Sequence, residues 1–259
     1  MTVPHDDRGL LLGDGLFETV LFKAGRPVLW DAHLGRLARG CAALGLPAPD
    51  PARVAEAASQ AVEARGLADV RAAVRITWTG GSGGRGLPRP DLLAPRLVVA
   101  AAASPRPETE ATVVTVSTRR NAGSPASRLK SLSYLDNVLA RREAAAAGAD
   151  EALMLNTDGL LACASAANLF WIAGGRLLTP ALEVGVLDGT MRGAVIEAAR
   201  RLGGKMLEVR AGPGALAGVE AAFLTSSLIG LRRIAYLDGR TIGGHALLAA
   251  LRDACRDLT

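Results

Sequence analysis

The chain has 259 residues, of which 49% are hydrophobic and 21% are charged, a composition typical of a globular protein with one or two domains. Its net charge is +5, but the arginines are scattered and no dense basic tract with interleaved aromatic residues occurs, which argues against nucleic-acid binding. Three widely spaced cysteines, no apolar run of roughly 20 residues and no visible signal peptide predict a cytoplasmic protein without disulfides or membrane contact. The mild positive charge favours a small anionic substrate or a phosphate-bearing cofactor.

The first half of the chain predicts strands with helices between them. Two strands are expected around a turn at 24–27. Asp31 is placed to cap a helix whose apolar residues recur at helical spacing up to Leu44. Further elements are expected at 51–65 (helix), 70–78 and 96–103 (strands). In the strand 70–78, Arg71 and Arg75 fall on the side opposite the apolar residues.

The second half predicts a barrel-like sheet. A strand over 112–117 and a loop over 119–129 precede a helix near 131–147. Short strands then follow closely, in the segments EALMLN, GLLAC, NLFWI, RLLT and AAFLTSS, with helices expected at 190–202 and 243–257. The pattern predicts an α/β (α+β) fold.

Residues 105–110 contain two prolines and no periodicity, which indicates a linker between domains. We therefore expect a small N-terminal α/β domain over 1–104 and a larger C-terminal domain over 111–259.

Lys130 is a candidate nucleophile. It is one of three lysines, with Lys23 and Lys205, among 30 basic residues. A lysine amine can lose a proton and attack a carbonyl, whereas a guanidinium stays charged. A solvated surface lysine is the ordinary alternative for any one of them.

Several segments could bind an anion. Gly189 and Thr190 stand at a predicted helix start, where free backbone N–H groups favour phosphate. Ser226 and Ser227 follow a strand, and Arg36 lies beside the apolar face of its helix. Each also has an ordinary explanation, in capping or solvation. Together with Lys130, a lysine at the entry of a predicted helix, they fit an enzyme that binds pyridoxal 5'-phosphate. No histidine and cysteine spacing predicts a metal site.

A resemblance then makes this expectation specific. The segments GDGLFETV…HLGRL, LKSLSYLDNVLARREAAAAGADEALML, SAANLFW and LLTP…GVLDGTMR resemble the class IV aminotransferase family, the fold type IV pyridoxal-phosphate enzymes. That family includes branched-chain and D-amino-acid aminotransferases and aminodeoxychorismate lyase. The segments SGGRG and DEALML…AANLFW look most like the lyase branch. The resemblance implies two domains with the cofactor between them, and a homodimer.

The resemblance also implies roles for single residues. Lys130 would be the Schiff-base lysine and proton shuttle. The phosphate would be held by Arg36, Gly189, Thr190, Ser226 and Ser227. The substrate would meet Phe17 and Arg85, the latter because a guanidinium in the GGSGGRG loop could bind a carboxylate.

Cys163 departs from the family pattern. The family has a glutamate there, which pairs with the pyridine nitrogen of the cofactor, and a neutral thiol is a weak partner for it. A weakened electron sink should hinder transamination more than elimination. We therefore expect a lyase that releases pyruvate from 4-amino-4-deoxychorismate and leaves 4-aminobenzoate for folate synthesis. Two alternatives stay open: an aminotransferase acting on a D- or branched-chain amino acid, and a non-catalytic pyridoxal-phosphate binder.

Overall fold

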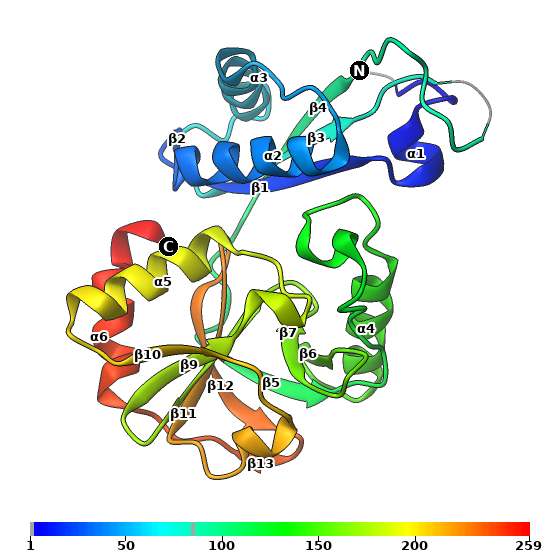
Figure 1. The fold of residues 1–259 in the computed structure, drawn as a ribbon. Helices are drawn as coiled ribbons and strands as arrows, with labels where there is room; N and C mark the ends of the chain where they lie inside the picture. The colour runs from blue at the N-terminus through cyan, green and yellow to red at the C-terminus, as the bar shows by residue number, and fades with distance from the viewer. Residues whose placement is uncertain (1–2, 84–85) are drawn as a thin grey trace. The chain divides into compact units, whose positions relative to one another are not determined.

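The computed structural model describes residues 3–83 and 86–259, which divide into two compact units (Figure 1). The first unit runs to Pro105 and takes in the separate segment Leu129–Ser133. The second unit is formed by Arg106–Arg128 and Tyr134–Thr259. Lys130 therefore belongs with the N-terminal unit, although it lies far beyond Pro105 in the sequence.

The first unit is an antiparallel sheet with its two longer helices packed against one face. Its helices are α1 (Arg8–Leu12), α2 (Trp30–Leu44) and α3 (Pro51–Glu63), and its strands are β1 (Gly15–Lys23), β2 (Arg26–Pro27), β3 (Ala72–Thr79) and β4 (Arg96–Ala103). The strand order is β2-β1-β3-β4. Leu16 and Val20 of β1 share a buried core with Leu37 and Cys41 of α2, so α2 covers their face of β1.

Alternation along β1 sends Phe17 and Thr19 to the opposite face, which these helices do not cover. The register places Thr19 opposite Arg75 of β3 and Phe17 opposite Thr77. Opposed residues on neighbouring strands have their side chains on the same face. Arg75 therefore lies with Phe17 on the helix-free face.

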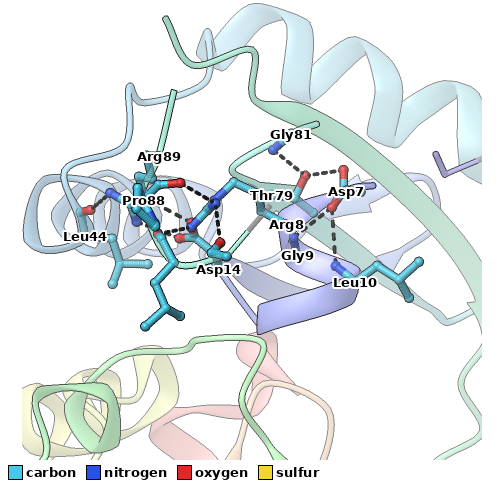
Figure 2. Close-up of polar contacts among 12 residues, drawn as sticks. Asp7, Arg8, Gly9, Leu10, Asp14, Leu44, Thr79, Gly81, Pro88 and Arg89 are labelled. Carbon is cyan, nitrogen blue, oxygen red and sulfur yellow. Dashed lines mark hydrogen bonds and ion pairs between the residues drawn. The ribbon is translucent and has the colours of Figure 1, made fainter. Parts of the chain in front are cut away.

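An ion-pair network fixes the N-terminal end of this unit (Figure 2). The buried Arg8 donates from Nε to Asp14 Oδ2 at 2.8 Å and from its other nitrogens to the carbonyl oxygens of Gly86, Leu87 and Pro88. Arg89 donates to both oxygens of the same carboxylate, from Nε to Oδ2 at 3.0 Å and from Nη2 to Oδ1 at 2.6 Å. The two arginines hold residues 86–89 against the start of β1.

The second unit is built on a curled sheet, which confirms the predicted α/β fold with a barrel-like sheet. Its strand order is β10-β9-β8-β11-β12-β5-β6-β7, with β13 paired to β12. The strands are β5 (Glu110–Thr115), β6 (Glu151–Leu155), β7 (Leu161–Ala164), β8 (Asn168–Ala173), β9 (Arg176–Pro180), β10 (Met206–Val209), β11 (Ala221–Ser226), β12 (Gly230–Leu237) and β13 (Arg240–Thr241). The helices are α4 (Leu135–Ala146), α5 (Thr190–Arg201) and α6 (Ala246–Ala254).

Short 3-10 turns complete the second unit at Pro125–Arg128, Leu182–Val184, Pro213–Leu216 and Arg256–Leu258. Leu169 and Trp171 of β8 face one core of this unit, whereas Phe170 stacks on Phe223 of β11 with ring centroids 5.1 Å apart. No helix of the described residues is both long enough and apolar enough to cross a bilayer.

Two local expectations were wrong. Asp31 does not cap α2, because the helix begins one residue earlier and its N-cap is Leu29, which has a positive φ of 54° and makes no side-chain capping bond. The helix expected near 131 begins only at Leu135. Lys130 is therefore not at a helix entry, and its segment pairs with β1 instead.

Candidate active site

Lys130 is held by backbone bonds to the first strand. The Phe17 N–H donates to the Lys130 carbonyl at 2.9 Å, and the Leu132 N–H donates to the Gly15 carbonyl at 3.0 Å. Gly15 permits this close approach, because a Cβ there would lie 2.5 Å from the Trp78 carbonyl oxygen and 2.9 Å from Leu132 Cδ1. The lysine is thus anchored on the edge of a buried strand.

The amine of Lys130 lies on an aromatic ring that it shares with a second cation. Its Nζ is 4.3 Å from the centroid of Phe17, a side chain that is only 6% exposed. The Cζ of Arg75 lies 3.8 Å from the same centroid. Phe17, expected from the resemblance to meet the substrate, is therefore a direct neighbour of the candidate nucleophile.

Arg36 lies in a buried cluster that sequence reasoning did not foresee. Glu18 accepts from Arg36 Nε at 2.8 Å and Nη2 at 2.5 Å, and its Oε2 lies 2.7 Å from Nδ1 of the fully buried His33. Burial alone would raise the pKa of Glu18, but the hydrogen bonds from Arg36 and His33 hold it below its usual range. The cluster lies under α2, on the face of β1 opposite to Phe17. The available signal was spacing, because Glu18 lies two residues from both Leu16 and Val20 and therefore shares their buried face of β1.

The start of α5 carries the features of an anion site. Gly189 is the N-cap of α5 and makes no side-chain capping bond, and the N–H groups of a helix N-terminus favour an anion. Thr190 Oγ1 lies 3.2 Å from Ser227 Oγ at the end of β11. Ser226 Oγ instead accepts from the Ile229 N–H at 3.5 Å, within the following turn. The structure thus brings Gly189, Thr190 and Ser227 together.

Two further polar residues support this site from the sheet. Asn168 of β8 donates from Nδ2 to the Leu187 carbonyl at 3.0 Å, and a Cβ on Gly189 would overlap its Oδ1. Thr225 lies opposite Asn168 in the sheet, and its buried hydroxyl has no hydrogen-bond partner among the described residues. Sequence reasoning named neither residue, although both stand within quoted motifs.

Cys163 is a buried thiol on β7. It lies opposite Met154 and packs with Ala162, Val184 and Val186. Burial raises its pKa, the nearby charge of Arg120 lowers it, and that of Glu151 raises it further. The net effect is upward, so the thiol is neutral near neutral pH.

Arg120 is a buried connector that the sequence did not single out. Its Nε donates to the Gly185 carbonyl at 3.1 Å and its Nη1 to Asn137 Oδ1 at 3.1 Å, while Nη2 donates to the Ser127 carbonyl. Asn137 in turn donates to the Ser165 carbonyl at 2.7 Å. These bonds tie α4 and the 119–128 loop to the segment that precedes the α5 anion site.

Arg85, expected to bind a carboxylate, lies outside the described residues. Among the residues that are described, His, Cys, Asp and Glu form no cluster of three that could hold a metal ion.

Each unit, taken by itself, carries groups that suit one end of pyridoxal phosphate. Lys130 supplies an amine for the aldehyde. The α5 N-terminus, the Thr190 and Ser227 hydroxyls and the unpartnered Thr225 hydroxyl supply donors for the phosphate. At Cys163, the position that the resemblance assigns to the ring nitrogen, the side chain is neutral and its β7 neighbour Ala162 is apolar.

Comparison with known proteins shows the family of the chain. The family model for amino-transferase class IV matches residues 15–237. The aminodeoxychorismate lyase of Bacillus subtilis is 31% identical over 86% of this chain and 77% of its own. The crystal structure of 4-amino-4-deoxychorismate lyase from Pseudomonas aeruginosa, 31% identical, superposes with a TM-score of 0.89 over 99% of this chain and 95% of its own. The pyridoxal-phosphate-bound form of a hypothetical aminotransferase from Mycobacterium tuberculosis, 26% identical, gives 0.85 over 100% and 93%.

The family match covers well over half of the chain, and the fold agrees with it throughout. The chain therefore belongs to the class IV aminotransferase family and is a pyridoxal-phosphate-dependent enzyme.

Proposed function

We propose that this enzyme is a lyase that converts 4-amino-4-deoxychorismate to 4-aminobenzoate and pyruvate, a step of folate synthesis. The observation that carries the proposal is the likeness, over almost the whole chain, to the lyase structure from Pseudomonas aeruginosa. The Bacillus subtilis lyase supports it independently at the level of sequence.

In this proposal Lys130 both holds the cofactor and moves the proton. The backbone bonds of its segment to Phe17 and Gly15 fix the point from which the side chain extends. Bound pyridoxal phosphate supplies an electron sink for the amine-bearing carbon. Lys130 takes the proton from that carbon, the C–O bond to the enolpyruvyl group breaks, and the departing enolpyruvate takes up a proton to become pyruvate. The electrons of the C–H bond remain in the ring and make it aromatic, which favours the reaction.

The phosphate would be held by Gly189, Thr190 and Ser227, with Ser226 shaping the turn. Backbone N–H groups of α5 and two hydroxyls suit a dianion. Arg36 would have fewer hydrogen-bond donors for the phosphate than the sequence suggested, because its Nε and Nη2 already donate to Glu18.

Cys163 favours elimination over amino-group transfer. A neutral thiol holds a proton on the pyridine nitrogen poorly, which weakens the electron sink on which transamination depends. Elimination that ends in an aromatic ring has its own driving force and depends less on that sink.

An aminotransferase acting on a D- or branched-chain amino acid is the second candidate. The likeness to the Mycobacterium tuberculosis aminotransferase favours it. A non-catalytic pyridoxal-phosphate binder is the third, and Cys163 is the feature that favours it.

A cytoplasmic homodimer acting on a small anionic amino-group substrate completes the proposal. Each unit exposes apolar side chains that a partner could cover. Leu10 and Leu11 of α1 are 64% and 59% exposed, and Leu135 and Val138 of α4 are 68% and 61% exposed. Apolar residues grouped in this way are typical of interaction surfaces.

The deciding experiment offers the purified enzyme 4-amino-4-deoxychorismate, and separately D-alanine or branched-chain amino acids with 2-oxoglutarate. The proposal predicts 4-aminobenzoate and pyruvate in equal amounts, with no keto acid consumed. Glutamate formation from 2-oxoglutarate without 4-aminobenzoate would establish the aminotransferase instead. Cofactor binding with neither product would favour the binder.

A further inference from the structure

We propose that Arg75 tunes Lys130: its guanidinium, which shares the Phe17 ring with the lysine amine, disfavours the charged form of that amine. The proposal rests on the proposed function only in taking Lys130 as the reactive lysine. Arg75 acts through Lys130 and is therefore a positioning residue rather than a catalytic one.

The sheet register brings the two cations to one ring. Phe17 and Arg75 lie on the helix-free face of β1 and β3, and Lys130 is bonded through its backbone to Phe17. The Lys130 Nζ and Arg75 Cζ lie 4.3 Å and 3.8 Å from the ring centroid. The distance between Lys130 Nζ and Arg75 Cζ therefore cannot exceed the sum of these two centroid distances.

Like charges at this separation affect each other measurably. At about 8 Å, repulsion lowers the pKa of the amine by about 0.4 units in water and about 1.5 units at the effective dielectric constant of a protein surface. The ring acts in the opposite direction, because its π face attracts an ammonium group. Arg75 occupies the same ring, so removing it takes away a repulsive charge and also leaves the ring to Lys130. Both changes raise the pKa of Lys130.

Other charged groups of the first unit are placed differently. On the helix-free face the remaining charged residues of β1, β3 and β4 are Lys23, at the far end of β1, and Arg96, which pairs with Asp7 at 3.4 Å. Glu18 lies on the opposite face with Arg36 and His33. The residues beside Lys130 in its own segment, 129 and 131–133, are uncharged.

The test titrates Lys130 in the full chain, freed of cofactor and checked for retained fold by circular dichroism. Acetic anhydride labels unprotonated amines, and peptide mass spectrometry resolves the labelling of Lys23, Lys130 and Lys205 against pH in one sample. The other two lysines serve as internal references. The variants are Arg75→Met, Arg75→Lys, and Arg53→Met as a control that removes the same charge from an exposed position on α3.

The expected result is a labelling midpoint for Lys130 that rises by about 0.4–1.5 pH units in Arg75→Met. It should stay near the parent value in Arg75→Lys and in Arg53→Met, and the rise should shrink at high salt. An unchanged Lys130 midpoint in folded Arg75→Met would overturn the proposal. Because no cofactor is present, a shifted midpoint in a chain that fails to bind pyridoxal phosphate would sustain this inference while contradicting the proposed function.

Discussion

Both carboxylate oxygens of the buried Glu18 accept hydrogen bonds from Arg36, at 2.8 Å to Nε and 2.5 Å to Nη2. This two-point contact fixes the plane of the guanidinium beneath α2. His33 Nδ1, 2.7 Å from the same carboxylate, adds a third contact. Arg36 is thus a structural partner of Glu18, whatever its contact with the cofactor.

Breaking this pair from one side should destabilise the protein strongly. Arg36→Ala removes two hydrogen bonds from the buried Glu18 carboxylate and leaves it in contact with His33, and we expect a loss of about 3–5 kcal/mol in unfolding free energy. The double variant Glu18→Gln/Arg36→Ala removes both charges and should lose less than Arg36→Ala. Urea unfolding of both variants and of Glu18→Gln measures the coupling. Strictly additive losses would contradict a coupled pair.

Arg36 also allows a test of phosphate binding. If its guanidinium reaches the phosphate, Arg36→Ala should raise the dissociation constant of pyridoxal phosphate by one to two decades, since a charge-assisted hydrogen bond contributes about 1.5–3 kcal/mol. Equilibrium dialysis at a temperature where the variant is fully folded makes the measurement. An unchanged dissociation constant would leave Arg36 with its structural role alone.

The network around Asp14 should make stability depend on acid pH. The hydrogen bond from Arg89 lowers the pKa of Asp14, burial opposes this, and the hydrogen bond from Arg8 reinforces it (Figure 2). Because the folded pKa is below the unfolded one, the stabilisation is present above the unfolded pKa and is lost as pH falls through the folded pKa. Asp14→Asn should therefore cost about 1–2 kcal/mol near neutral pH, and less at acid pH, below the ordinary aspartate pKa of about 3.9.

Thermal unfolding of Asp14→Asn at several pH values measures this difference. Asp91→Asn, at an exposed position in the same region, is the matched control and should change little. A difference between Asp14→Asn and the parent that is as large at about pH 3 as at neutral pH would show that the carboxylate charge is not responsible.

Cys163→Glu should shift the chemistry toward amino-group transfer. A carboxylate accepts a charge-assisted hydrogen bond from a protonated pyridine, which a neutral thiol cannot match. The site is tightly packed by Val184 and Val186, so overpacking should cost about 1–3 kcal/mol and the folded, cofactor-loaded fraction is measured first. The readout is the ratio of amino-group transfer from an amino acid to pyruvate release from 4-amino-4-deoxychorismate.

Cys163→Ser is the control for the substitution itself, because it alters the side chain without adding a charge. A ratio that is the same in Cys163→Glu, Cys163→Ser and the parent would show that position 163 does not tune the ring. Cys163 would then give no support to a lyase over an aminotransferase.

The fold was largely predictable because most elements carry strong local patterns. The apolar spacing of α2 and the alternation of β3 each reflect burial on one side, and both appear in the structure. Four elements were missed, namely α1, β10, β12 and β13, and β12 carries two arginines at its centre. β10, for example, has two exposed residues among its four. Their pairing depends on neighbouring strands rather than on their own sequence.

The candidate site was only partly predictable, for a related reason. Gly189 and Thr190 were identifiable because helix starts have a local signature. The Glu18–Arg36 pair and the ring shared by Lys130 and Arg75 join residues that only sheet register brings together. The sequence placed Lys130 at the entry of a helix, but its segment instead forms an antiparallel bridge with β1.

The most direct test of the account locates the cofactor in the chain. The purified protein, yellow with bound pyridoxal phosphate, is reduced with borohydride, digested and mapped by mass spectrometry. We expect the reduced cofactor on Lys130, the lysine whose backbone carbonyl accepts from the Phe17 N–H, and none on Lys23 or Lys205. Label on either of those two lysines, or on no lysine in a cofactor-saturated sample, would contradict it.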